Sequence, residues 1–245
     1  MQEATSIPAP TFEEGHVEAD RFRIRHVSAG AGAPLVHLHG GGGLELTPAH
    51  DLLARGRRVI AFEMPGFGDS PENTRHRTMP DLARTMLEAV SALGVERFDL
   101  LGTSFGGKTA LWVAILAPER VGAVVLESPA AIRPEGHPPP QEQRATTGPL
   151  VARLMAPNRD AALEEAMQGL AVPVLVVFGT RDRVIPPEMG RVYKALLPSC
   201  QLLFVYDAGH AVSTDRPEAF TEAALDFLER HEQYVVSRRG SVIFP

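Results

Sequence analysis

The sequence predicts an α/β protein built on a doubly wound, mostly parallel β-sheet. Three observations lead to this prediction: short β-branched and apolar runs recur along the 245 residues, segments with helical spacing lie between them, and several of the runs are apolar almost throughout. A strand covered by helices on both faces has no solvent-facing side, so continuous apolar runs are typical of parallel sheets. Alternating strands and helices indicate βαβ units.

The elements follow in order along the chain. Strands are expected at residues 22–27, 34–40, 57–64, 97–102, 121–128, 172–179 and 200–207. Helices are expected at residues 80–93, 105–117, 187–197 and 217–231.

One stretch, residues 129–170, departs from this alternation. It is proline-rich at first and weakly helical afterwards, and the sheet resumes at Val172. We interpret it as a short cap or lid inserted over one edge of the sheet and not as a second domain. Residues 1–245 are therefore expected to form a single domain, a length that α/β folds reach undivided.

Composition and charge exclude several functional classes. The chain has 24 Lys and Arg against 30 Asp and Glu, a formal charge of −6, and no basic stripe, so neither DNA nor RNA is expected as a partner. Cys200 is the single cysteine, which rules out an internal disulfide and fits the cytoplasm. No apolar run approaches the roughly 20 residues that cross a bilayer. A small-molecule substrate is the expected partner.

The segment Gly102-Thr103-Ser104-Phe105-Gly106 forms a G-x-S-x-G pattern between an expected strand and an expected helix. In that context the pattern is typical of a nucleophile elbow, a sharp turn that lifts the serine hydroxyl above the sheet. Glycines two positions on either side let neighbouring backbone pass closely, and the start of the helix points free N–H groups at developing negative charge. Ser104 is therefore the candidate nucleophile.

The same stretch also matches a motif from a different class. Residues 102–109 fit G-x-x-x-x-G-K-[ST], the phosphate-binding P-loop of nucleotide hydrolases. That class needs a later strand ending in an Asp that holds Mg²⁺, whereas the next strand ends in Glu127. Phe105 would also place a bulky ring in a loop that wraps phosphates. We therefore favour the serine hydrolase over the P-loop hydrolase.

A serine nucleophile needs a base and an acid that orients the base. His210 follows an expected strand at the sheet edge where open parallel sheets bind ligands, and an imidazole suits proton transfer near neutral pH. Asp182 follows the preceding strand and can fix the tautomer of the imidazole. The alternative acid is Glu127, and the structural alternative for Asp182 is a turn residue paired with Arg181 or Arg183.

These residues resemble the α/β-hydrolase family. The order Ser104, Asp182, His210 is the family's order of nucleophile, acid and base. Residues 39–43, a histidine and four glycines, resemble the family's oxyanion loop, and residues 63–70 resemble its D-x-P-G-x-G-x-S turn. Four motifs in the correct order are more specific than any one of them.

The resemblance implies an oxyanion hole and a mechanism. The backbone N–H groups of Phe105 and Gly41 would hold the oxyanion, with Gly42 as an alternative to Gly41. Ser104 would form an acyl-enzyme that water releases, and no cofactor is needed. Glu63 replaces the customary Asp of the turn, a departure outside the triad.

Two histidines, His37 and His39, form an H-x-H pair that could belong to a metal site. Zinc would require further ligands close by in the sequence, and glycines occupy those positions. No metal is expected.

Substrate identity depends on the cap and the pocket walls. A small carboxylester is the preferred substrate, and a meta-cleavage-product type carbon–carbon bond hydrolase, a thioesterase or a lactonase would use the same triad. A non-catalytic ligand-binding relative is a further alternative. The cap residues expected to line the pocket, or else to anchor the cap, are Leu150, Leu154, Met155 and Met167.

Overall fold

A computed structural model describes residues 10–70, 72–134, 136 and 148–231 of the chain. The strands are β1 (Glu13–Ala19), β2 (Phe22–Ala29), β3 (Pro34–Leu38), β4 (Arg58–Phe62), β5 (Phe98–Thr103), β6 (Val121–Glu127), β7 (Val174–Gly179) and β8 (Cys200–Val205). The helices are α1 (Pro48–Leu53), α2 (Met79–Ala92), α3 (Phe105–Leu116), α5 (Pro149–Met155), α6 (Ala161–Gln168), α7 (Met189–Leu196), α8 (Val212–Asp215) and α9 (Pro217–Arg230).

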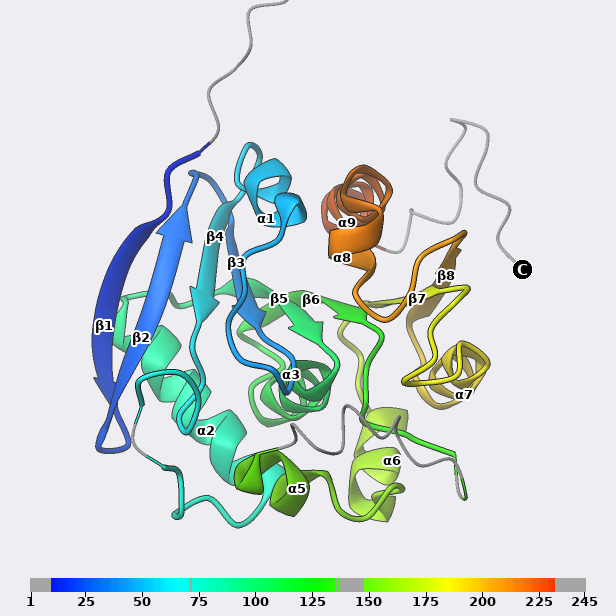
Figure 1. Cartoon of the computed structure of the whole chain (residues 1–245), viewed down its shortest axis with the longest axis horizontal. Helices are drawn as coiled ribbons and strands as arrows, with labels where there is room; N and C mark the ends of the chain where they lie inside the picture. The colour runs from blue at the N-terminus through cyan, green and yellow to red at the C-terminus, as the bar shows by residue number, and fades with distance from the viewer. Residues whose placement is uncertain (1–9, 71, 135, 137–147, 232–245) are drawn as a thin grey trace, which may run out of the picture.

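The strands form one 8-stranded sheet in the order β1-β2-β4-β3-β5-β6-β7-β8. Pairs from β4 to β8 are parallel, whereas β2 is antiparallel to both of its neighbours. The strand order reverses around β3, so helices cover both faces (Figure 1). The predicted α/β class with a doubly wound, mostly parallel sheet is confirmed.

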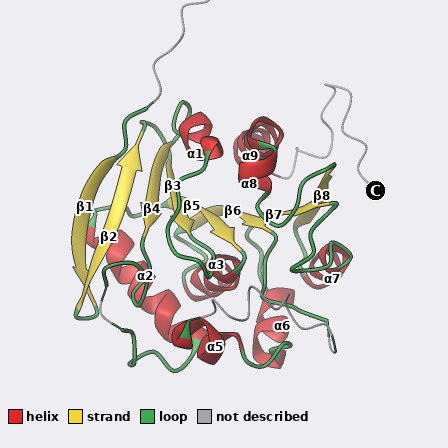
Figure 2. Ribbon diagram, viewed as in Figure 1, coloured by secondary structure: helices red, strands yellow, loops and turns green. Residues whose placement is uncertain are grey.

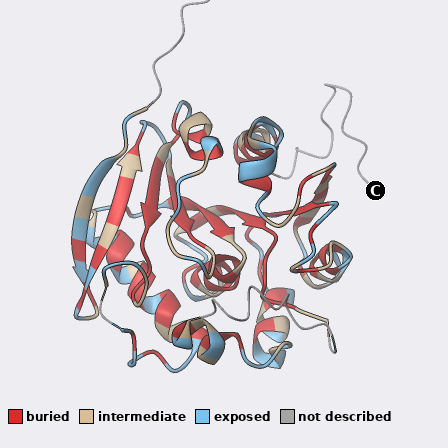
Figure 3. Cartoon of the chain, in the orientation of Figure 1, coloured by how far each residue is buried: buried red, intermediate tan, exposed pale blue. Residues whose placement is uncertain are grey.

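Two hydrophobic cores lie on the two faces of the sheet. Helices α2, α3 and α7 pack on one face, and α1, α8 and α9 pack on the other (Figure 2). Met86, Leu111 and Tyr193 belong to the first core, and Leu53 and Phe227 belong to the second. The central strands are buried along nearly their whole length (Figure 3), which explains their continuous apolar sequences.

Helix α2 illustrates how local sequence fixes an element. Thr78 accepts a hydrogen bond from the backbone N–H of Asp81, whose carboxylate accepts one from the Thr78 N–H, a reciprocal capping box. Leu82, Met86 and Val90 then recur at helical spacing and are buried against the sheet. The spacing predicts this helix to within a residue at each end.

The sequence prediction missed β1, α1 and the 4-residue α8. In β1 only Val17 and Ala19 are buried, because it is an edge strand that exposes most of its other residues. Such a strand lacks the apolar pattern on which the prediction relied. Helix α1 has 6 residues, too few for a helical period to emerge from the sequence.

The segment between β6 and β7 contains α5 and α6, which match the two weakly helical stretches of the expected cap. Both helices lie on the side of the sheet that carries α2 and α3 (Figure 1). Residues 135 and 137–147 of the expected cap lie outside the described residues. That residues 129–170 act as a lid on a single domain stays a prediction.

Candidate active site

Ser104 lies on the sharp turn that joins β5 to α3. Its backbone has φ 51° and ψ −108°, a region that residues other than glycine rarely adopt. The turn requires glycine on both sides: a Cβ on Gly102 would lie 2.7 Å from the Cβ of Ala110, and one on Gly106 would lie 2.0 Å from the carbonyl oxygen of Leu38. Close packing of α3 against β3 and β5 thus holds the serine in a strained, raised position.

Three side chains predicted from separate strand ends meet above the sheet. His210 Nε2 lies 2.9 Å from Ser104 Oγ, and His210 Nδ1 lies 2.8 Å from Asp182 Oδ2. Hydrogen bonds of this length let the imidazole accept the serine proton while the carboxylate orients the ring. The side chain of Asp182 is fully buried, whereas that of His210 is 20% exposed and faces the pocket.

The Asp182 carboxylate is fixed by the turn that follows β7. Its Oδ1 accepts hydrogen bonds from the backbone N–H groups of Val184 and Ile185, at 2.8 and 3.0 Å. This leaves Oδ2 free to accept the hydrogen bond from His210. Arg181 instead forms an ion pair with Asp207, so the structural alternative of an Asp182–Arg181 pair is not what the turn contains.

The glycine loop after β3 lies beside the nucleophile. A Cβ on Gly40 would be 3.6 Å from Ser104 Cβ, and one on Gly41 would be 4.0 Å from Phe105 Cβ. Phe105 begins α3, and the first N–H groups of a helix have no partner within it. The two backbone segments proposed to bind the oxyanion are therefore adjacent.

His39 fastens this loop to the end of β4. Its Nε2 accepts a hydrogen bond from the backbone N–H of Met64 at 3.0 Å, so the proton is on Nδ1, which donates to the carbonyl oxygen of Gly40 at 2.6 Å. Burial lowers the pKa of His39 to about 4, which keeps the ring neutral at physiological pH. The histidine has a structural role in the loop.

A cavity of about 890 Å³ opens over Ser104 and His210. Leu150 and Met155 line it, as expected for pocket residues. Leu154 and Met167 do not, because they point into the core beneath α5 and α6, where they are 3% and 0% exposed. Pocket residues that the sequence prediction missed include Phe67, Asn73, Arg133, Val151 and Ile185.

Arg133 is a cationic side chain at the wall of this cavity. Its Nη2 donates a hydrogen bond to the carbonyl oxygen of Met155 at 3.1 Å. Its Nε is buried and has no hydrogen-bond partner among the described residues. No sequence motif surrounds Arg133, so only the fold identifies it as a pocket residue.

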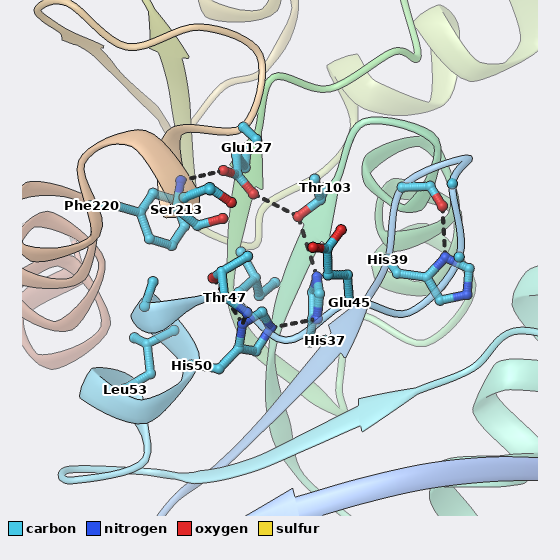
Figure 4. A pocket seen from close by; sticks show the side chains of 17 residues that line it. His37, His39, Glu45, Thr47, His50, Leu53, Thr103, Glu127, Ser213 and Phe220 are labelled. Carbon is cyan, nitrogen blue, oxygen red and sulfur yellow. Dashed lines mark hydrogen bonds between the residues drawn. The ribbon is translucent and has the colours of Figure 1, made fainter. Parts of the chain in front are cut away.

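Glu127, the alternative acid, forms its hydrogen bonds with groups other than the His210 ring. It is 1% exposed at the end of β6. Its Oε2 accepts a hydrogen bond from Thr103 Oγ1 at 2.7 Å, and its Oε1 accepts one from the backbone N–H of Ser213 at 2.6 Å. These groups border a second cavity of about 190 Å³ behind the glycine loop (Figure 4).

Residues 102–109 do not form a loop that could wrap a phosphate. Lys108 is 2% exposed inside α3, and its Nζ donates to the carbonyl oxygen of Leu154 and lies 3.7 Å from Asp160 Oδ2. The lysine therefore fastens α3 to the segment that carries α5 and α6. The P-loop interpretation has no support in this arrangement.

The part of the chain described by the structure contains no group of three or more His, Cys, Asp or Glu side chains that could hold a metal. In particular, His37 and His39 bond to different partners. Within the same described ranges, no helix is both long enough and apolar enough to cross a membrane.

Comparison with known proteins gives consistent matches. A family model described as "alpha/beta hydrolase fold" matches residues 33–156, and one described as "TAP-like protein" matches residues 149–233. The chain is 29% identical to the dihydrolipoyllysine-residue acetyltransferase component of the acetoin cleaving system of Pseudomonas putida, over 91% of this chain and 70% of that protein. It is 26% identical to the 2-hydroxy-6-oxo-6-(2'-aminophenyl)hexa-2,4-dienoic acid hydrolase of Metapseudomonas resinovorans, over 89% and 92% of the two chains.

A solved structure shares the fold. The 2-hydroxy-6-oxo-6-phenylhexa-2,4-dienoate hydrolase of Rhodococcus sp. strain RHA1 superposes with a TM-score of 0.75 at 20% identity, over 90% of this chain and 99% of that one.

Proposed function

The chain belongs to the α/β-hydrolase fold family and is an enzyme of that class, and from this premise we propose that it is a serine hydrolase that forms an acyl-enzyme on Ser104. The observation that carries the proposal is the uninterrupted contact from Ser104 Oγ through His210 to Asp182, at 2.9 and 2.8 Å. A strained serine at the floor of an 890 Å³ cavity adds to it.

The reaction has two steps. Ser104 Oγ attacks the carbonyl carbon of the substrate while His210 Nε2 takes the serine proton, and Asp182 stabilises the imidazolium. The N–H groups of Gly41 and Phe105 hold the oxyanion, a contribution of about 3 kcal/mol for each donor. His210 then protonates the leaving group, and a water that His210 deprotonates releases the acyl group from Ser104.

The preferred substrate is a small carboxylester. An ester needs only a carbonyl at Ser104 and a leaving group that His210 can protonate. Residues such as Phe67, Leu150 and Met155 give the cavity an apolar wall that suits an aliphatic acyl or alcohol group.

The test is labelling by a fluorophosphonate probe together with hydrolysis of p-nitrophenyl acetate and butyrate. Wild type should be labelled and active, and Ser104→Ala should lose both properties. Ser91→Ala, which alters an exposed serine on α2, is the matched control and should keep both. A folded wild type that is neither labelled nor active would refute the proposal, as would full labelling of Ser104→Ala.

A carbon–carbon bond hydrolase is the second candidate, and one observation favours it. The relative from Metapseudomonas resinovorans is named for a dienoic acid substrate, and Arg133 offers a guanidinium at the cavity wall that could pair with such a carboxylate. This candidate uses the same Ser104, His210 and Asp182.

Parallel assays separate the two candidates. Turnover of 2-hydroxy-6-oxo-6-phenylhexa-2,4-dienoate, followed by loss of its absorbance, is compared with turnover of p-nitrophenyl butyrate. If the carboxylate pairs with the guanidinium, Arg133→Met should lower kcat/KM for the dienoate by about 10- to 100-fold, the value of a hydrogen bond to a charged group. A much smaller loss is expected on the uncharged ester. Ester turnover without any dienoate turnover would reject the second candidate.

A further inference from the structure

A directed chain of buried hydrogen bonds runs behind the glycine loop. The backbone N–H of Thr47 donates to His50 Nδ1 at 2.9 Å, so the His50 proton is on Nε2, which donates to His37 Nδ1 at 2.9 Å. His37 Nε2 in turn donates to Thr103 Oγ1 at 3.2 Å, and the Thr103 hydroxyl donates to Glu127 Oε2 at 2.7 Å. Every donor in the chain points toward the carboxylate. Figure 4 draws the hydrogen bonds that join His50, His37, Thr103 and Glu127 as dashed lines.

The carboxylate at the end of this chain has a second support. Glu127 Oε1 accepts the backbone N–H of Ser213 at 2.6 Å. The donors that hold Glu127 are thus a hydroxyl and an amide, which are neutral. Hydrogen bonds donated to both oxygens favour the ionised carboxyl group, and they oppose the effect of burial at a site that is 1% exposed.

Both partners of Glu127 are neighbours of reacting residues. Thr103 directly precedes Ser104 at the end of β5, and Ser213 lies in α8, shortly after His210. A single carboxylate therefore joins the strand that carries the nucleophile to the helix that follows the base. The proposed triad does not use Glu127, because Asp182 already occupies His210 Nδ1.

We propose that Glu127 is a positioning residue of the active site, which sets the geometry of Ser104 and His210 through Thr103 and Ser213 and supplies a second negative charge facing His210. This inference rests on the serine hydrolase function proposed above. According to this inference two acidic groups act on His210: Asp182 through a direct hydrogen bond, and Glu127 through the electrostatic effect of its charge.

The charged groups around Glu127 come from several elements. Burial raises the pKa of Glu127, and its hydrogen bonds and the charge of His210, on the loop after β8, oppose this rise. His37 and His50 lie beyond Thr103, and burial lowers the pKa of each, so both are neutral near pH 7. Glu45 borders the same cavity. Of these groups, the imidazolium of His210 is the charge that Glu127 can stabilise.

The first test is the pH profile of kcat/KM on p-nitrophenyl butyrate for Glu127→Gln. The new side-chain amide can still accept the Ser213 N–H through its oxygen and can donate to Thr103 Oγ1 through its nitrogen, so the fold is expected to persist. Loss of the charge should disfavour the imidazolium and move the acidic limb to lower pH by about 0.5 to 1 unit. Glu222→Gln, which removes an exposed charge on α9, should leave the limb in place.

A second pair of variants keeps the inference open to refutation if Glu127→Gln does not fold. Thr103→Val removes the hydroxyl donor, so burial should neutralise Glu127 and move the acidic limb in the same direction. Thr103→Ser keeps the hydroxyl and should restore the wild-type profile. A folded Glu127→Gln whose limb coincides with that of Glu222→Gln, or identical profiles for the two Thr103 variants, would overturn the inference.

The outcomes also separate this inference from the function on which it rests. If wild type hydrolyses the ester and Ser104→Ala does not, the proposed function stands whatever the Glu127 profile shows. An inactive wild type would refute the proposed function itself.

Discussion

Protonation of His50 should couple the stability of the protein to pH. The side chain is 2% exposed, and burial lowers its pKa from 6.5 to about 4. Its Nδ1 already accepts the N–H of Thr47, so there is no lone pair left for a proton. Between pH 6.5 and about 4 the unfolded chain binds a proton there that the folded chain does not. The stability that depends on His50 being neutral is fully present above pH 6.5 and is lost as the pH falls toward 4.

The magnitude follows from the two pKa values. At about 1.4 kcal/mol per pKa unit, a fall from 6.5 to about 4 corresponds to about 3 kcal/mol of unfolding free energy. His50→Asn removes this dependence, since the Asn Oδ1 can accept the Thr47 N–H but does not titrate. The variant should lose about 1 to 2 kcal/mol at pH 7, because the bond to His37 is gone. Its slope of stability against pH should be smaller by up to about 1.4 kcal/mol per unit.

The assay is urea unfolding followed by circular dichroism, from about pH 4.5 to 7.5, for wild type and His50→Asn. His16→Asn, a substitution of an exposed histidine on β1, is the matched control. Parallel slopes for wild type and His50→Asn would refute the reasoning, because they would mean that His50 takes up its proton equally in both states.

Three further predictions concern the proposed acid, the turn that holds Ser104 and the core beneath α7. Asp182→Asn should lower kcat by about 10³- to 10⁴-fold with the fold intact, measured on p-nitrophenyl butyrate. Gly106→Ala should destabilise the protein by about 3 kcal/mol or more, or prevent folding, because its Cβ would collide with backbone carbonyls at the end of β3; urea unfolding measures this. Tyr193→Phe should cost about 1 to 3 kcal/mol in the same assay, since the buried hydroxyl donates to the carbonyl of Pro129 at 2.9 Å.

The sequence predicted those features that depend on local pattern. Central strands are buried on both faces, so their apolar runs were visible. Ser104 and Asp182 each follow such a strand closely, whereas His210 follows the edge strand β8. The fold then brings these strand ends to one edge of the sheet, which is why three residues far apart in the chain could be grouped from the sequence alone. Their catalytic roles stay a proposal.

Features created by packing between distant segments could not be predicted in the same way. Arg133 belongs to no motif, and it becomes a pocket residue only because the chain after β6 folds back over Ser104. His37 looked like half of a metal pair, yet its partner is His50, 13 positions away on a helix too short to show a period. The sequence shows which polar residues are present, but it does not show which of them bond to each other.

The two cavities share part of one wall, formed by Gly40, Gly42 and Thr103. Because Thr103 lines both compartments, altering it reshapes both at once, so engineering there would confound substrate fit with the alignment of Ser104. Val151 and Met155 line the larger compartment alone. Directed evolution of substrate range is therefore best confined to the α5 side, where volume can change while the wall behind the nucleophile keeps its shape.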